Sequence, residues 1–228
     1  MKLTFDLPAP KPSHLVKKDR LWSTYYYAHA AKEVSSGGVP LWNASNKPLG
    51  PSLSQRDWCL AAMEGTVAVK RKDGSVKTYN YSGKGEPAQT SCKAVFPHLK
   101  PAVLAGTERV RWKVSNGPYG DGAASYVLVP FRTWAVDRQR IPLGTVLYVR
   151  EARGVEIVLP NGSKKTHDGY FFAADVGGAI KGNHVDSFLG ITSSNPFPFV
   201  KSAPQHTFDA HVVQNKSVQD FLVQEHHA

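Results

Sequence analysis

Three aspartates, Asp137, Asp175 and Asp186, are the residues of this sequence best placed for chemistry. Asp137 and Asp175 each follow an apolar, β-prone run, so each carboxyl group is expected at the rim of a sheet. Clustered carboxyl groups have a raised pKa in one member, through burial and like-charge repulsion. A carboxyl group that stays protonated near neutral pH can act as a general acid. One such residue alone would more simply be a turn aspartate, so the prediction depends on the three together.

A glycine-rich segment connects Asp175 to Asp186. Gly177 and Gly178 allow the backbone to turn tightly and to approach a ligand, because glycine has no side chain to obstruct either. The turn expected at 182–183 can then return the chain so that Asp186 faces Asp175. The spacing therefore predicts that these two carboxyl groups lie close together.

The sequence around the aspartates resembles a known family. The matching segments are 135–137 (AVD), 141–145 (IPLGT) and 175–182 (DVGGAIKG), followed by Asp186. They resemble the 3D domain, named for its three aspartates, and the related catalytic domain of MltA-type membrane-bound lytic murein transglycosylases. The resemblance covers about residues 131–213, and residues 23–27 (STYYY) look like the first barrel strand of the same family.

The resemblance implies a six-stranded double-psi β-barrel and a lyase that degrades the cell wall. Such an enzyme cleaves the β-1,4 bond between N-acetylmuramic acid and N-acetylglucosamine and leaves a 1,6-anhydromuramoyl product. One carboxyl group can protonate the leaving oxygen and then deprotonate the C6 hydroxyl that attacks the anomeric carbon. We assign this role to Asp186, with Asp175 and Asp137 orienting it or stabilising positive charge on the sugar. Which of Asp175 and Asp186 is the acid/base stays open. No cofactor is expected.

Further residues are expected to bind the glycan strand. Gly177, Gly178 and Lys181 would shape the site, and Tyr25 and Trp134 would stack on sugar rings. Lys181 could hold a substrate carboxylate or an aspartate, or be a solvated turn lysine. Strand aromatics are more often core residues, although alternation turns one of Tyr25 and its neighbour outward.

The histidines give weaker patterns. His184 could tune Asp186, but a histidine on a surface loop is the simpler interpretation. His167 and Asp168 resemble a metal pair, yet two residues do not make a site, and no metal is predicted. The histidines at 226–227 are expected in a free tail.

Many short β-prone runs separated by turns predict a mainly β chain with one or two short helices. An extended lead-in is expected at 1–20 and the catalytic barrel at 21–215, with a loop-rich insertion at about 32–130 and a C-terminal tail at 216–228. A helix capped by Ser54 and a hairpin turning at Asp73 and Gly74 are the clearest local predictions. Residues 82–106 are expected to be irregular.

The charge of the chain indicates a polyanionic partner. The sequence has 28 Lys and Arg against 18 Asp and Glu, a net charge of +10. Such a surplus attracts nucleic acid, anionic membranes or anionic wall polymers. No nucleic-acid motif is present, and no apolar run is long enough to span a membrane. We therefore expect the partner to be the glycan strands of peptidoglycan. The protein is expected to be a monomer. An expansin-like wall-binding module without turnover is the alternative.

Two further features concern the compartment. Cys59 and Cys92 could form a disulfide or remain two thiols. The N-terminal residues lack the apolar core of a signal peptide. Action in the periplasm or cell wall would then fit a trimmed exported enzyme, a phage lysis enzyme or an effector delivered into a rival cell.

Overall fold

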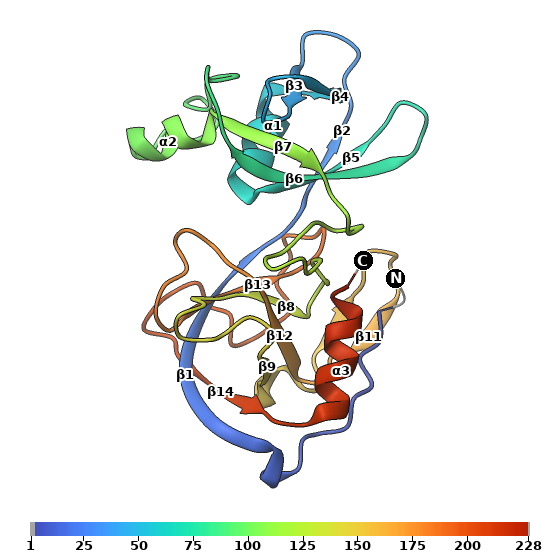
Figure 1. The fold of residues 1–228 in the computed structure, drawn as a ribbon, viewed down its shortest axis with the longest axis vertical. Coiled ribbons are helices and arrows are strands. Elements are labelled where there is room, and N and C mark those ends of the chain that lie inside the picture. Colours follow the sequence, from blue (N-terminus) through green and yellow to red (C-terminus); the bar gives the residue numbers. More distant parts are fainter. Residues whose placement is uncertain (1–2, 228) are drawn as a thin grey trace. The chain divides into compact units, whose positions relative to one another are not determined.

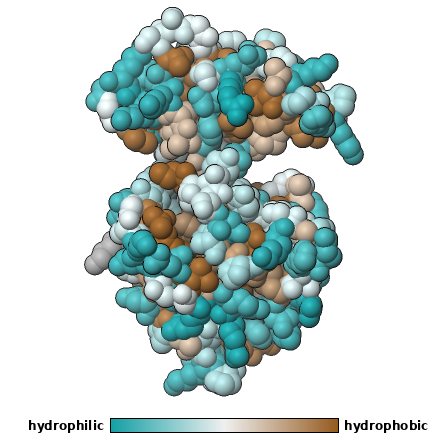
Figure 2. All heavy atoms as spheres, turned by 180° about the vertical axis from the view of Figure 1, so that it is seen from behind, coloured by the Kyte–Doolittle hydropathy of each residue, from teal (hydrophilic) through white to brown (hydrophobic). Residues whose placement is uncertain are grey.

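The computed structural model describes residues 3–227 and divides into two compact units (Figure 1). One unit combines the chain up to Tyr27 with the chain from Asp121 onward, and the other is Ala28–Gly120. Each unit has a largely hydrophilic surface on the face drawn in Figure 2, with apolar residues in small patches. Among residues 3–227, no helix has the length and apolarity that crossing a bilayer requires.

The first unit contains the predicted six-stranded barrel, which is closed in the order β1-β13-β8-β12-β9-β14. Its strands are β1 (Leu15–Tyr26), β8 (Thr133–Ala135), β9 (Val146–Tyr148), β12 (Tyr170–Asp175), β13 (His184–Phe188) and β14 (Phe208–Val213). The pairs β1–β13 and β8–β12 are parallel, and the other four pairs are antiparallel. Because only β9 and β12 pair as consecutive barrel strands, the other connections cross the barrel. The predicted mainly β barrel fold is confirmed.

Aromatic side chains fill the barrel. Trp134 of β8 is fully buried and stacks on Phe171 of β12, with ring centroids 4.5 Å apart. Phe208 of β14 packs edge-on against the same tryptophan. Alternation sends every second residue of each strand into this core, so the neighbours of Trp134 point to the other face of the wall.

Short elements complete the first unit. They are η1 (Pro12–His14), η2 (Arg150–Ala152), the hairpin of β10 (Glu156–Val158) and β11 (Lys164–Thr166), and α3 (Lys216–Glu225). The Asn215 side chain caps α3, and Val218 and Leu222 bury its apolar face in a cluster with Phe172. β1 begins at Leu15, so strand structure starts inside the segment interpreted as a lead-in.

The chain end at α3 is not a free tail. His226 is fully buried, and its ring nitrogens lie 3.0 Å from the Thr133 hydroxyl and 2.7 Å from the Leu222 carbonyl oxygen. The expectation of a free histidine tail was therefore wrong for His226. The two polar partners explain why a histidine can be buried here, because neither ring nitrogen is left without a hydrogen-bond partner.

A buried ion pair ties the N-terminal segment to the barrel. Arg132 donates from both terminal nitrogens to Asp168, at 2.5 and 2.8 Å. Arg132 also donates to the Thr4 carbonyl, and the Leu7 N–H donates to Asp168. Burial alone would raise the pKa of Asp168, but the guanidinium holds it below its usual value. With its carboxylate used in this way, Asp168 is not arranged as a metal ligand beside His167.

The second unit is more regular than a loop-rich insertion. A four-stranded sheet runs in the order β2-β5-β6-β7, and β3 and β4 form a separate pair. The elements are β2 (His29–Lys32), β3 (Val39–Trp42), β4 (Pro48–Leu53), α1 (Gln55–Glu64), β5 (Thr66–Lys70), β6 (Val76–Lys84), α2 (Pro101–Thr107) and β7 (Val110–Val114). The predicted turn at Asp73 and Gly74 joins β5 to β6.

Of the two helices in this unit, α1 was predicted and α2 was not. The Ser54 hydroxyl accepts from the Asp57 N–H and caps α1, as predicted. α2 lies at the end of a segment interpreted as irregular, and Pro101 occupies its first turn, where a missing N–H costs nothing. A short helix that begins with proline is easily missed in a glycine- and proline-rich stretch.

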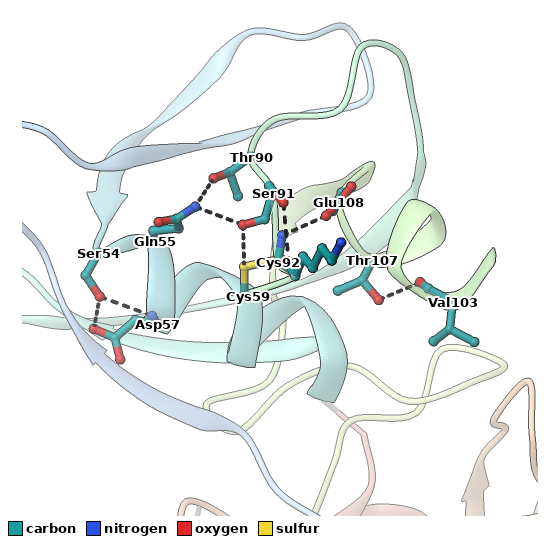
Figure 3. The surroundings of a disulfide bond; sticks show 11 residues. Ser54, Gln55, Asp57, Cys59, Thr90, Ser91, Cys92, Val103, Thr107 and Glu108 are labelled. Atoms are coloured by element: carbon teal, nitrogen blue, oxygen red, sulfur yellow. Dashed lines mark hydrogen bonds between the residues drawn. A yellow bond between two sulfur atoms is a disulfide. The ribbon is translucent and has the colours of Figure 1, made fainter. Parts of the chain in front are cut away.

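A disulfide joins α1 to the loop before α2. Cys59 of α1 and Cys92 are bonded to each other, and both are fully buried (Figure 3). The Cys92 N–H donates to the Glu108 carboxylate at 2.7 Å, which fixes the loop from its other side. The bond closes a span of 33 residues within one unit.

Removing this bond should destabilise the second unit. In a chain-entropy view, a cross-link over a span of this length contributes about 4 kcal/mol. We expect the Cys59→Ala/Cys92→Ala variant to lose that amount in urea unfolding followed by tryptophan fluorescence. Dithiothreitol should lower the stability of the natural chain and leave the variant unchanged. Equal stability of both chains under oxidising conditions would contradict the prediction.

Candidate active site

Four strands bring the predicted carboxyl groups onto one face of the barrel wall. Ala135 of β8 pairs with Asp186 of β13 on one side and with Asp175 of β12 on the other. Asp186 in turn pairs with Thr24 of β1. Directly opposed residues point to the same face of a sheet, so these four form one row, the carboxyl row. At about 4.8 Å per strand the aspartate α-carbons lie roughly 10 Å apart, with only the methyl group of Ala135 between them.

Residues next to the carboxyl row point into the barrel. Ser23 and Ser187 are both buried, and their hydroxyl oxygens lie 3.0 Å apart. Trp134, next to Ala135, is also fully buried. The row therefore lies on the outer face of the wall, where a polymeric substrate can reach it.

A bulge in β12 turns Asp175 to this face. Ala173 lies opposite Trp134 and Asp175 lies opposite Ala135, so Ala174 is an extra residue. In a regular strand without a bulge, Ala174 would lie opposite Ala135, and alternation would point Asp175 into the barrel. The Ala174 carbonyl accepts from the Ala123 N–H at 2.8 Å.

Gly122 allows the chain to approach this bulge. A Cβ at Gly122 would lie 2.3 Å from the Ala174 oxygen, which is too close for any other residue. The requirement for this glycine became visible only when the bulge placed the Ala174 carbonyl against it.

Asp186 is half-buried and has one hydroxyl partner. The Thr24 Oγ1 lies 2.6 Å from its Oδ1. Burial raises the pKa of Asp186 to about 6, against the opposing effect of the hydrogen bond from Thr24. A carboxyl group with this pKa is partly protonated near neutral pH, which suits a general acid.

Asp175 is held by two donors. The Tyr26 hydroxyl donates to its Oδ2 at 2.7 Å, and the Val176 N–H donates to its Oδ1 at 2.8 Å. Burial nevertheless raises the pKa of Asp175 to about 6, and the charge of Asp186 adds to the rise. The charge of Asp186 therefore affects the titration of Asp175.

Asp137 lies apart from the carboxyl row and anchors a loop. Its side chain accepts from the Gly182 N–H at 2.9 Å and from the Gln139 N–H at 3.1 Å. These two bonds, with a smaller effect of the nearby Lys181 charge, lower the pKa of Asp137. Asp137 therefore holds the loop that leads from Asp175 to β13, and its carboxyl group has a lower pKa than those of the other two aspartates.

The residues predicted to bind substrate have different surroundings. Tyr25 is 37% exposed, so its ring remains accessible, whereas Trp134 is fully buried. Trp134 is therefore a core residue that stacks on Phe171, and its predicted contact with sugar was wrong. Lys181 is exposed in the loop that Asp137 anchors.

The predicted glycines of this loop differ in what surrounds them. A Cβ at Gly177 would lie 2.6 Å from the buried side chain of Ile180, so this position has little room for any other residue. A Cβ at Gly178 would meet nothing within 4 Å. Gly177 is thus required by local packing, whereas Gly178 leaves an open approach to the backbone.

Several partners of the aspartates were missed in the sequence. Thr24 and Tyr26 lie on β1, some 160 and 150 residues before the carboxyl groups they contact. Only the parallel pairing of β1 with β13 brings them together. The resemblance had indicated a barrel strand at 23–27, but not which of its side chains would face the site.

No metal centre is formed by the part of the chain that is described. Within residues 3–227, no group of three His, Cys, Asp or Glu side chains is arranged to hold an ion. The carboxyl row and its neighbours offer two carboxyl groups, the hydroxyl groups of Thr24 and Tyr26, and the ring of His184. This set suits proton transfer at an oxygen.

Comparison with known proteins supports the resemblance. The family model of the 3D domain matches residues 132–195, which include all three aspartates. E. coli MltA with bound chitohexaose has a similar fold, with a TM-score of 0.56 and 21% identity over 86% of this chain and 72% of that one. MltA from Neisseria gonorrhoeae has a similar fold as well, with a TM-score of 0.54 and 14% identity over 87% of this chain and 73% of that one.

A membrane-bound lytic murein transglycosylase from Agrobacterium tumefaciens gives a TM-score of 0.52 and 16% identity, over 92% of this chain and 79% of that one. No curated protein sequence matches the chain. The 3D-domain resemblance is thus confirmed. The structural likeness extends it, as a likeness of fold, beyond the residues that carry the motif.

The coupling within the carboxyl row can be measured in the free protein. We expect Asp186→Asn to lower the pKa of Asp175, because the neighbouring negative charge is removed. The fall should be less than one, since burial is the larger cause of the rise. Carbon-13 NMR of the Asp175 carboxyl carbon gives this value directly.

Asp220→Asn, an exposed substitution on α3, is the matched control for this measurement. Asp220 pairs with the exposed Lys216, and it is not among the causes of the Asp175 shift. The pKa of Asp175 should therefore be the same as in the natural chain. If the pKa of Asp175 is the same in Asp186→Asn as in the natural chain, the two carboxyl groups are not coupled.

Proposed function

We propose that the chain is a lytic murein transglycosylase that cleaves the bond between N-acetylmuramic acid and N-acetylglucosamine. The carboxyl row is the observation that carries this proposal, because it combines two carboxyl groups with pKa values of about 6 on an accessible face. The 3D-domain match and the likeness of fold to MltA enzymes support it. Such an enzyme needs no cofactor, because the substrate supplies its own nucleophile.

Asp186 is the proposed acid. Asp175 accepts from a backbone N–H, which can only donate and so favours the ionised form of its partner. Asp186 contacts only a threonine hydroxyl in the row, and a hydroxyl can also accept from a protonated carboxyl group. When the pair holds one proton, that proton therefore belongs on Asp186. Asp175 is then the ionised member.

The reaction follows from this distribution of charge. Asp186 gives its proton to the glycosidic oxygen as the bond to the anomeric carbon breaks. The ionised Asp175 stabilises positive charge that develops on the sugar ring. Asp186, now a carboxylate, takes the proton of the muramic C6 hydroxyl, whose oxygen bonds to the anomeric carbon and closes the anhydro ring. Asp186 ends the cycle protonated, as it began.

The same substrate accounts for the charge of the chain. Murein carries lactyl and stem-peptide carboxylates, and the net charge of +10 favours association with such a polymer. We accordingly propose glycan strands of peptidoglycan as the partner and the periplasm or cell wall as the place of action. A monomer suffices, because every residue of the carboxyl row comes from one chain.

Digestion of purified murein sacculi tests the activity. Mass spectrometry should detect anhydro-muropeptides after incubation with the natural chain. Asp186→Asn should lower the rate by about 10²- to 10⁴-fold, the usual range for loss of a general acid or base. Asp220→Asn, an exposed substitution on α3, is the control and should keep full activity. Binding to sacculi without any soluble product would instead support a wall-binding module.

The activity should also depend on pH with a maximum near 6. Below this pH both carboxyl groups become protonated, so the charge that stabilises the sugar cation is lost. Above it Asp186 loses its proton, so the leaving oxygen can no longer be protonated. We expect a bell-shaped profile of kcat/KM on soluble glycan strands. A rate that is constant between pH 5 and pH 8 would contradict the assigned roles.

A further inference from the structure

A histidine reaches the carboxyl row through the Thr24 hydroxyl. His184 of β13 pairs with Trp22 of β1, two residues before the pairing of Asp186 with Thr24. Its Nε2 lies 2.8 Å from Thr24 Oγ1, which lies 2.6 Å from Asp186 Oδ1. A single oxygen atom thus connects the imidazole ring to the carboxyl group.

The imidazole ring and its backbone are both held in place. The ring stacks on the Trp22 indole with centroids 3.6 Å apart and planes 6° apart, and it is hydrogen-bonded to the backbone of Ala179. The backbone N–H of His184 donates to the Lys181 carbonyl at 3.2 Å. A half-buried ring fixed in this way does not swing out of contact with Thr24. The interpretation of His184 as a surface loop histidine was therefore wrong.

The Thr24 hydroxyl has one proton, so it can donate to only one of its two neighbours. When it donates to Nε2 of a neutral ring, its oxygen is free to accept from a protonated Asp186. When it donates to an ionised Asp186, a neutral ring whose proton is on Nδ1 loses its donor. One hydrogen bond therefore separates the two states of Asp186, and it favours the protonated state.

We propose that His184 is a positioning residue for Asp186, and that its neutral ring acts through the Thr24 hydroxyl to favour the protonated carboxyl group from which the reaction starts. The inference deepens the proposed function, on which it rests for the part that Asp186 plays. No proton passes to the histidine during the cycle. The ring instead selects the direction in which the Thr24 hydroxyl points.

The surroundings of the ring agree with a neutral state. Burial lowers the pKa of His184, which favours the uncharged ring. Earlier in β1, Lys17 pairs with Asp19, and Lys18 and Arg20 pair with Asp209, while Tyr25 is exposed. The titratable groups of the site itself are Tyr26 of β1, Asp175 of β12, Asp137 after β8 and Lys181 before β13. Tyr26 and Asp175 bond to each other, and Asp137 bonds to the backbone of the loop, so none of these three replaces His184 as the partner of Thr24.

His184→Phe tests the proposal, because phenylalanine keeps a ring for Trp22 to stack on and removes the nitrogen that faces Thr24. Carbon-13 NMR of the Asp186 carboxyl carbon should give a pKa lower by roughly 0.5 to 1, the effect of one ordinary hydrogen bond. In a Thr24→Val background the same replacement should leave this pKa unchanged. The conservative Thr24→Ser variant should retain the full effect of His184→Phe.

His206→Gln, in an exposed loop of the same unit, is the control and should move no Asp186 pKa. The proposal is overturned if His184→Phe leaves the pKa of Asp186 unchanged or raises it. It is equally overturned if the fall persists without the Thr24 hydroxyl, since a general disturbance of the site would then be the cause.

A reciprocal measurement covers the case in which His184→Phe does not fold. Coupling between two sites acts equally in both directions. Asp186→Asn should therefore lower the pKa of the His184 ring, followed by its proton NMR signal, by more in the natural background than in the Thr24→Val background. Equal shifts in the two backgrounds would overturn the proposal.

Kinetics distinguish positioning from substrate binding. In His184→Phe the alkaline limb of the kcat/KM profile should move to lower pH by the same amount as the Asp186 pKa, with KM unchanged. A rise in KM at constant kcat would instead make His184 a binding residue and overturn the proposal. If the natural chain releases no anhydro-muropeptides, the proposed function fails. The NMR measurement of the Asp186 pKa needs no turnover, so it tests the effect of His184 separately.

Discussion

The pairing of β8 on both of its edges is the constraint on which the site depends. Ala135 is the residue at which β13 and β12 meet the same strand, so it fixes the separation of the two carboxyl groups. A longer side chain at Ala135 would fill the space between them. The strand is only three residues long, and it is held by β12, by β13 and by the Val136 N–H, which donates to the Asp175 carbonyl. The geometry of the carboxyl row is therefore set by backbone hydrogen bonds between strands.

The three aspartates show how one residue type acquires different states on one barrel. Two N–H groups surround Asp137 and lower its pKa, so it serves as a fixed anchor for the loop that precedes β13. Asp175 and Asp186 are more deeply shielded, and burial outweighs the donors that each receives. The difference arises from position along the strand. Asp137 follows the end of β8, whereas Asp175 and Asp186 lie opposite Ala135, within the paired strands.

The aspartates and the barrel could be predicted because a local sequence pattern carries them. The glycine-rich segment after Asp175 and the segment at 141–145 keep their order and spacing in the chain, so a resemblance can be recognised. The capped helix α1 and the turn at Asp73 were predictable for the same reason. Thr24 and His184 could not be assigned, because their roles come from a parallel pairing between distant segments. Trp134 was misassigned because alternation states that a strand has two faces, but not which face is buried.

Register connects these observations, because a slip of one residue in any of the four strands would exchange the two faces of the wall. In β1, such a slip would turn Thr24 into the barrel and leave Ser23, whose hydroxyl now bonds Ser187, opposite the carboxyl group. The buried aromatic core opposes such slips, since Trp134 would be forced toward water. Hydrophobic burial on the inner face thus protects the alignment of polar groups on the outer face. The bulge at Ala174 breaks this alternation at the point where Asp175 must change sides.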